Sequence, residues 1–131
     1  MQKPTTILLV DDEPLILMDL EFAAEDEALR PLCAANVAAA IEHIEGAGTP
    51  VDCAVLDVSL QDGENCLPIA RALDARGIPF IIHSGDLDRQ DETIRSLNAV
   101  RIAKPACSRK VIATAIEAYG RNRGDLATAA E

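Results

Sequence analysis

Short apolar runs alternate with helical patterns along the chain, and this alternation limits the fold more than any other feature. The apolar runs have the character of buried strands. Continuous apolar strands that alternate with amphipathic helices predict a parallel sheet covered on both faces, and right-handed crossovers make such a sheet doubly wound. We therefore expect an α/β protein with five strand–helix units, (βα)5. The predicted strands are residues 6–10, 29–35, 51–58, 78–83 and 100–103.

A helix is predicted after each strand. The first begins at Pro14, a residue favoured in a first helical turn, and carries Leu15, Met18 and Phe22 at helical spacing. Together with Ile16, these apolar residues are more numerous than one buried stripe requires. We expect most of them to pack into the core, and any that stay exposed to form a docking surface.

The other helices have recognisable ends. Asn36 is a suitable N-cap for the second helix, and Pro68 lies near the first turn of the third. The fourth helix is the mostly polar segment 88–97. The last helix is predicted to begin at a Ser108 cap and to end at Gly120.

One domain is expected over residues 1–120, with a short C-terminal tail over residues 121–131. Hydrophobic residues make up 49% of the chain, which is enough for a core at this length. The tail is rich in alanine and polar residues, and we expect it to be frayed or loosely helical. Because it is too short for an output domain, no DNA-binding domain is expected after the last helix.

Composition argues against several classes of partner. The net charge of −10 repels phosphate backbones, and an aromatic content of 2% leaves little for base stacking, so nucleic acid is not expected. No apolar stretch approaches the roughly 18 residues of a membrane span, and the N-terminus does not resemble a signal peptide. The cysteines lack metal-ligand spacing, which favours a reduced, cytoplasmic setting.

Polar residues close four of the five predicted strands. Asp11 and Asp12 follow the first strand, Asp57 ends the third, Ser84 closes the fourth and Lys104 closes the fifth. Because the carboxyl ends of parallel strands lie on one edge of the sheet, where ligands bind, these side chains are predicted to gather in one small site.

The charges of this site predict both a metal and a phosphoryl group. Two carboxylates about 5 Å apart repel by roughly 3 kcal/mol at an effective dielectric constant of 20, so three need a compensating cation. Lys104 supplies one positive charge, and an Mg²⁺-like ion suits the oxygen ligands. In this interpretation Asp57 is the nucleophile, Asp12 binds the metal directly, and Asp11 binds it directly or through water. Ser84 donates a hydrogen bond to the phosphoryl group.

Four short segments resemble the receiver domain of bacterial two-component response regulators, over about residues 5–120. They are Val10-Asp11-Asp12-Glu13, Leu56-Asp57-Val58, Ser84-Gly85 and Lys104-Pro105. The resemblance implies a flavodoxin-like fold and Mg²⁺-dependent (or Mn²⁺-dependent) phosphorylation of Asp57. It also implies that the backbone carbonyl of Ser59 completes the metal shell and that Lys104-Pro105 is a cis peptide. The donor would be a histidine kinase or a histidine phosphotransfer protein.

The sequence departs from the receiver pattern in three places. The loop after Asp57 lacks the usual Met-Pro pair and is shorter. Ile102 stands where we expect the aromatic residue that couples to Ser84. Residues 78–85 resemble in part a subfamily of stand-alone receivers with Pro-Phe-x-Phe-Ala-Thr-Gly-Tyr, but His83 replaces its alanine. His83 could tune the site, although a structural role in the core is the favoured interpretation.

The function predicted from these residues is that of a single-domain response regulator, a monomer or weak homodimer that signals to protein partners or drains phosphate from them. It would be no enzyme beyond assisting its own phosphorylation and dephosphorylation. A degenerate receiver that binds partners without phosphorylation is one alternative. A small phosphohydrolase with an Asp nucleophile is another, but such enzymes usually show Asp-x-Asp after the first strand, and here Asp11 and Asp12 are adjacent.

Overall fold

The computed structural model describes residues 4–46, 48–60, 63–85, 97 and 99–130, of which 122–130 are described by their backbone alone. Its centre is a five-stranded parallel sheet with strand order β2-β1-β3-β4-β5. This arrangement confirms the predicted doubly wound α/β fold. The strands are β1 (Thr6–Val10), β2 (Arg30–Ala34), β3 (Cys53–Asp57), β4 (Phe80–Ser84) and β5 (Arg101–Ala103).

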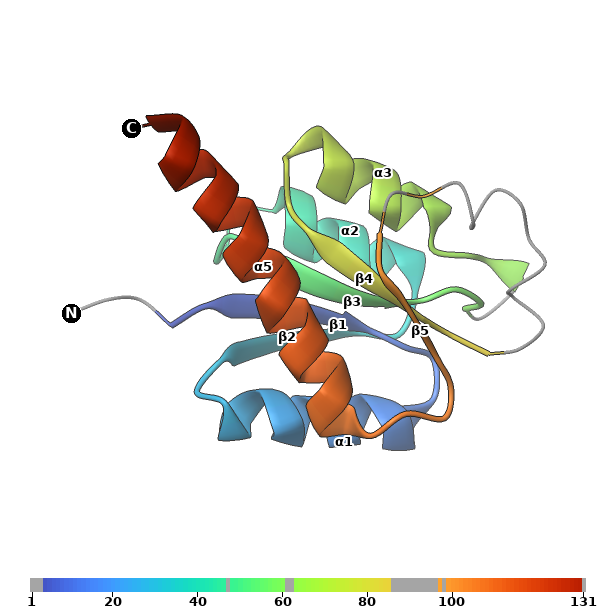
Figure 1. Cartoon of the computed structure of the whole chain (residues 1–131). Coiled ribbons are helices and arrows are strands. Elements are labelled where there is room, and N and C mark those ends of the chain that lie inside the picture. Colours follow the sequence, from blue (N-terminus) through green and yellow to red (C-terminus); the bar gives the residue numbers. More distant parts are fainter. Residues whose placement is uncertain (1–3, 47, 61–62, 86–96, 98, 131) are drawn as a thin grey trace.

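Helices cover both faces of the sheet, as Figure 1 shows. On one face lie α1 (Pro14–Asp26) and α5 (Ser108–Ala130), and on the other lie α2 (Val37–Glu45) and α3 (Leu67–Ala75). The predicted helix over residues 88–97 falls almost entirely outside the described residues. None of the helices that the structure describes is long and apolar enough to cross a membrane.

The core consists of two aliphatic layers, one on each side of the sheet. Strand β1 is buried along its whole length and sends Ile7 and Leu9 toward α1 and α5, while Leu8 and Val10 face α2 and α3. This alternation follows from the two-residue period of a strand. It explains why the strands that are buried on both faces appear in the sequence as continuous apolar runs.

Helix α1 turns its apolar stripe away from the core. Its buried residues are Leu20, Ala23 and Ala24, whereas Leu15 is 72% exposed and Phe22 is 55% exposed. The expectation that most of these large apolar residues pack into the core is therefore wrong for Leu15 and Phe22. The small alanine side chains lie on the side of the helix that faces the sheet and α5, so the larger residues three and four positions apart fall on the opposite side.

Helix α5 differs from the prediction at both ends. The backbone N–H of Val111 donates to the carbonyl of Cys107 at 3.1 Å, which makes Cys107, and not Ser108, the residue that precedes the helix. The helix also continues through Gly120 to Ala130. A glycine ends a helix when it adopts a left-handed conformation, as Gly77 does after α3 with φ +67. Gly120 has no such positive φ.

The N-cap of α2 gives a direct test of the local structure. The Asn36 side-chain oxygen accepts a hydrogen bond from the Ala39 backbone N–H at 2.8 Å, as predicted for a cap. Asn36→Ala is expected to lower the free energy of unfolding by about 1 kcal/mol, because that N–H loses its partner. Asn36→Asp keeps the acceptor and should retain most of the stability in urea unfolding. Equal losses in the two variants would contradict the cap.

Candidate functional site

Three aspartates meet at the carboxyl edge of the sheet. Asp11 directly follows β1, Asp12 is the next residue, and Asp57 is the last residue of β3. One carboxylate oxygen from each lies within 4.8 Å of the others. Asp11 and Asp57 are almost fully buried, at 1% and 5% exposed. A cluster of carboxylate oxygens at this spacing has the donor chemistry that Mg²⁺ or Mn²⁺ prefers.

Lys104 joins two of these aspartates. Its Nζ lies 3.1 Å from Asp11 Oδ2 and 3.2 Å from Asp57 Oδ1. The residue is held there because its backbone N–H donates to the Ser84 carbonyl at 2.8 Å, one step beyond the β4–β5 pairing. The Lys104-Pro105 peptide is cis, as predicted. Three carboxylates and one ammonium thus share the edge, which leaves an excess of negative charge.

The burial of this cluster changes how its groups hold protons. Burial and, to a lesser degree, the charge of Asp11 raise the pKa of Asp57, Lys104 partly offsets both, and the net result is a pKa of about 7. Burial alone would lower the pKa of Lys104, but its hydrogen bond with Asp11 and the charge of Asp57 outweigh that effect and raise it. The ammonium is therefore permanently charged, and one ammonium is too little for the carboxylates around it.

Asp11 also fixes the turn that leads into α1. Its Oδ1 accepts from the Glu13 backbone N–H at 2.9 Å, and its own backbone N–H donates to the Ala34 carbonyl at 3.2 Å. The sequence left open whether Asp11 caps a turn or serves the site. It does both, because Oδ1 holds the turn while Oδ2 holds Lys104.

The two serines of the predicted site lie at the same edge but outside the charged cluster. Ser84 ends β4 and is buried, yet in the part of the chain that the structure describes its hydroxyl makes no hydrogen bond with the aspartates. Ser59 lies two residues after Asp57, is exposed, and pairs with Asn65 across an isolated bridge. Within this loop the Leu60 N–H also donates to the Glu64 carbonyl at 2.8 Å.

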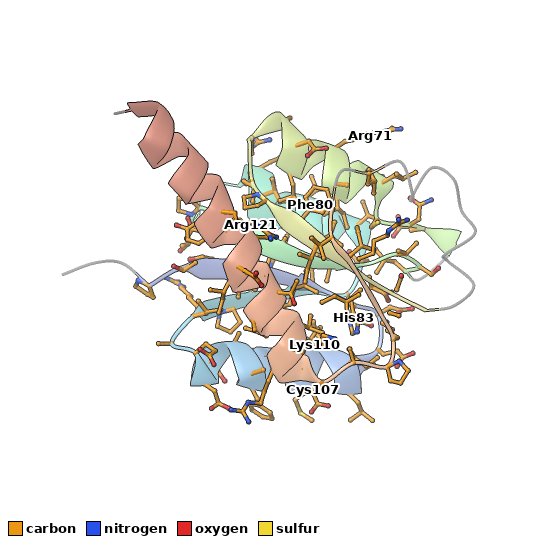
Figure 2. The ribbon with its side chains drawn as sticks, viewed as in Figure 1. Arg71, Phe80, His83, Cys107, Lys110 and Arg121 are labelled. Atoms are coloured by element: carbon orange, nitrogen blue, oxygen red, sulfur yellow. The ribbon has the colours of Figure 1, made fainter. Side chains whose placement is uncertain are left out.

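His83 lies next to the cluster on the α1/α5 side of the sheet, where Figure 2 labels it. It pairs in register with Asp57 on β3 and is 4% exposed. Among the described residues neither ring nitrogen has a hydrogen-bond partner. Burial lowers the pKa of His83, and the nearby charge of Lys104 lowers it further. The imidazole is therefore neutral at physiological pH. A structural role was the favoured prediction for His83; the side chain is buried, and it also lines a cavity.

Solved structures with similar folds identify the family. The single-domain receiver SdrG from Sphingomonas melonis Fr1 is 38% identical, over 91% of this chain and 98% of SdrG, with a TM-score of 0.73. This chain belongs to the response regulator receiver domains. Two further structures share the fold. A response regulator receiver protein from Sinorhizobium medicae WSM419 is 22% identical over 92% of this chain and 98% of that protein, with a TM-score of 0.81. A CheY-like response regulator receiver domain protein from Methanospirillum hungatei JF-1 is 23% identical over 94% of this chain and 99% of that protein, with a TM-score of 0.79. Neither a protein-family model nor a curated protein sequence matches the chain.

Strand register corrects one expectation about this receiver. Ile102 pairs with His83, and Ala103 pairs with Ser84. Ile102 packs into the core on the α1/α5 side, whereas Ser84 points to the other face. The prediction that Ile102 replaces an aromatic residue coupled to Ser84 is therefore wrong. The residues of β5 that share the face of Ser84 are Arg101 and Ala103, because side chains alternate along a strand.

The excess charge predicts a pH-dependent cost of stability at Asp57. The folded protein keeps a proton on Asp57 up to about pH 7, while the unfolded chain releases it near 3.8, so stability falls as pH rises across that window. Asp57→Asn removes this loss. In EDTA, its stability relative to the parent is expected to rise by on the order of 2 kcal/mol between pH 5 and pH 8 in urea unfolding.

Two controls sharpen this measurement. Asp74→Asn, which removes an exposed carboxylate from α3, should show no such trend. Added Mg²⁺ should reduce the difference in free energy of unfolding between the parent and Asp57→Asn at pH 8. A cation at the cluster stabilises the parent, and the variant offers it one carboxylate fewer. A difference that does not change with pH would mean that Asp57 carries no raised pKa.

Proposed function

We propose that this receiver accepts a phosphoryl group on Asp57 from a phosphohistidine donor, in a reaction that depends on Mg²⁺ or Mn²⁺. The observation that carries the proposal is the buried cluster itself: three carboxylates within 4.8 Å, with Lys104 in contact with two of them. An acidic protein gains nothing in stability from burying such a cluster. It gains a site in which a cation and a phosphoryl group bind together.

Each residue has a defined role in this proposal. The ligands of the cation are Asp12, Asp57, the Ser59 carbonyl, and Asp11 directly or through water. When bound, the cation neutralises the excess charge and polarises the phosphoryl oxygens. An Asp57 oxygen attacks phosphorus, an O–P bond forms, and the N–P bond to the donor imidazole breaks. Lys104 stabilises the charge on the transferring group. The electron pair of the N–P bond stays on the donor nitrogen, and a donor ring that is protonated on its other nitrogen leaves as neutral imidazole.

Ser84 would act after transfer. Ser84 ends β4 at the same edge of the sheet and is buried. In the described part of the chain, its hydroxyl makes no hydrogen bond with the aspartates. A phosphoryl group on Asp57 would bring an acceptor oxygen toward this hydroxyl. The hydrogen bond formed there would report phosphorylation to the rest of the domain.

The partner is proposed to be a histidine kinase or a histidine phosphotransfer protein. Leu15, Met18 and Phe22 form an exposed stripe on α1, here called the α1 apolar stripe, and α1 begins two residues after Asp12. An apolar stripe next to a reactive carboxylate is where a donor helix must dock for transfer to occur.

The same proposal covers the setting of the domain. We assign residues 1–120 to the receiver and residues 121–131 to a short C-terminal tail, into which α5 continues as far as Ala130, and we place the protein in the cytoplasm. All four cysteines are free, which suits a reducing compartment. The domain would act as a monomer or weak homodimer that switches a protein partner or draws phosphate from a kinase, with no catalysis beyond its own phosphorylation and dephosphorylation.

Intact-mass measurement tests the phosphorylation directly. Incubation with acetyl phosphate and Mg²⁺ is expected to give a single phosphoryl adduct, and Asp57→Asn should abolish it because no acceptor remains. Asp12→Asn should slow its formation by at least about tenfold at limiting Mg²⁺, because a cation ligand is lost. Asp74→Asn is the matched control and should label as the parent does.

The two alternative functions give different results in the same assay. Steady release of phosphate from phosphate esters would indicate a phosphohydrolase. A protein that forms no adduct, and binds no beryllofluoride in the presence of Mg²⁺, would be a receiver that works without phosphorylation.

Docking on the α1 apolar stripe makes a separate prediction. Phe22→Ser is expected to slow transfer from autophosphorylated histidine kinases of the same organism by roughly tenfold, because a side chain of this size contributes about 1–3 kcal/mol to an interface. Glu25→Ser, on an exposed position of the same helix, is the control. Equal rates for parent and Phe22→Ser would place the donor elsewhere on the surface.

A further inference from the structure

A cavity borders the phosphorylation site and shares Lys104 with it. Its volume is about 360 Å³, and it opens between the first half of α1 and the segment that joins β5 to α5. One side of its wall is formed by Glu13, the residue before α1, and by Ile16 and Asp19 of α1. The other side is formed by Pro105, Ala106 and Ser108, with Lys104 and His83 between the two. This volume is at the lower end of the range for binding pockets, and suits a single side chain.

The wall contains a polar group that the domain itself leaves unused. His83 is 4% exposed, and neither Nδ1 nor Nε2 has a hydrogen-bond partner among the described residues. Burying such a ring unpaired costs free energy, and natural proteins rarely accept that cost without a purpose. A neutral imidazole offers one donor and one acceptor, so the cavity presents an unused hydrogen-bonding group beside largely apolar walls.

The charges around the cavity select for a cation. Glu13 and Asp19 are exposed carboxylates on its α1 side. Lys104 is the only cationic residue in the wall, and its ammonium is already paired with Asp11 at 3.1 Å and Asp57 at 3.2 Å. An anion would meet two carboxylates that form no ion pair among the described residues, whereas a cation would meet two partners at the entrance.

We propose that this cavity receives a basic side chain, an arginine or lysine, of the donor protein that docks on α1. The cationic head would lie between Glu13 and Asp19, and an N–H of that head would donate to the unprotonated nitrogen of His83. The identity of the partner rests on the proposed function, but the recognition of a basic side chain does not.

The position of the cavity on α1 supports this occupant. Asp19 lies one helical turn beyond Leu15, so the cavity wall directly borders the α1 apolar stripe. A partner helix that packs on Leu15, Met18 and Phe22 would therefore bring its flanking residues to the cavity entrance. The protein's net charge of −10 further favours a partner with basic residues around its apolar contact.

A small probe tests the recognition chemistry without any partner. The full chain is titrated with n-butylguanidinium while the ring signals of its two histidines are followed by NMR. We expect saturable shifts of His83 and none of His43, which lies on α2 and serves as an internal reference. N-butylurea, a neutral molecule of similar shape, should bind at least about tenfold more weakly.

Variants then locate the binding site. Asp19→Asn should weaken n-butylguanidinium binding by about fivefold or more, whereas Asp26→Asn, at the far end of α1, should not. With an autophosphorylated kinase as donor, Asp19→Asn should lower the transfer rate relative to the acetyl phosphate rate by a similar factor. Equal binding of the urea and the guanidinium, no saturable shift of His83, or indifference to Asp19→Asn would each overturn the proposal. A missing Asp57 adduct would instead overturn the proposed function alone.

Discussion

The contact of one ammonium with two buried carboxylates organises this domain. Lys104 lies about equally far from Asp11 and Asp57, at 3.1 and 3.2 Å, and each of these residues ends or follows a different strand. One ammonium cannot neutralise three acids, and the uncompensated charge of Asp11 adds to the effect of burial in raising the pKa of Asp57 to about 7. The edge of the sheet therefore carries more negative than positive charge. That excess of negative charge favours a cation at the edge, and a bound cation would in turn favour the phosphoryl group of the proposed function.

The sheet supplies this geometry without any special loop. β1 and β3 are neighbours in the strand order, so their carboxyl ends bring Asp11 and Asp57 together, and β4 separates them from β5, which ends one residue before Lys104. The long lysine side chain spans that separation, and its backbone N–H is tied to the Ser84 carbonyl. A shorter basic group at the end of β5 would not reach both acids. The doubly wound topology thus decides which residue types can serve at each strand end.

Sequence reasoning succeeded where a residue's position depends on the strand it follows, and failed where it depends on which way a side chain points. The apolar runs located all five strands, and the polar residues that follow β1, β3 and β5 correctly indicated that Asp11, Asp12, Asp57 and Lys104 lie together. The position of Ile102 was misjudged because a difference of one residue in register moves a side chain to the other face of the sheet. The stripe of α1 was misjudged because both sides of the helix carry apolar residues, and only packing shows that Ala23 and Ala24 form the buried side. No sequence signal could have revealed the cavity around His83, since it forms between two segments distant in the chain.

The two sides of α1 explain how one helix could serve both the core and a partner. Helix α1 buries Ala23 and Ala24 together with Leu20 against the core, whereas the α1 apolar stripe is left exposed to solvent. The loop from Asp11 into α1 is held by the Asp11–Glu13 hydrogen bond, so the apolar stripe has a fixed position relative to the reactive carboxylate. A donor that docked on that stripe, as proposed, would be oriented by the same aspartate that holds Lys104. Asp11 would then couple docking to phosphoryl transfer, because one carboxylate oxygen holds the turn into α1 and the other holds Lys104.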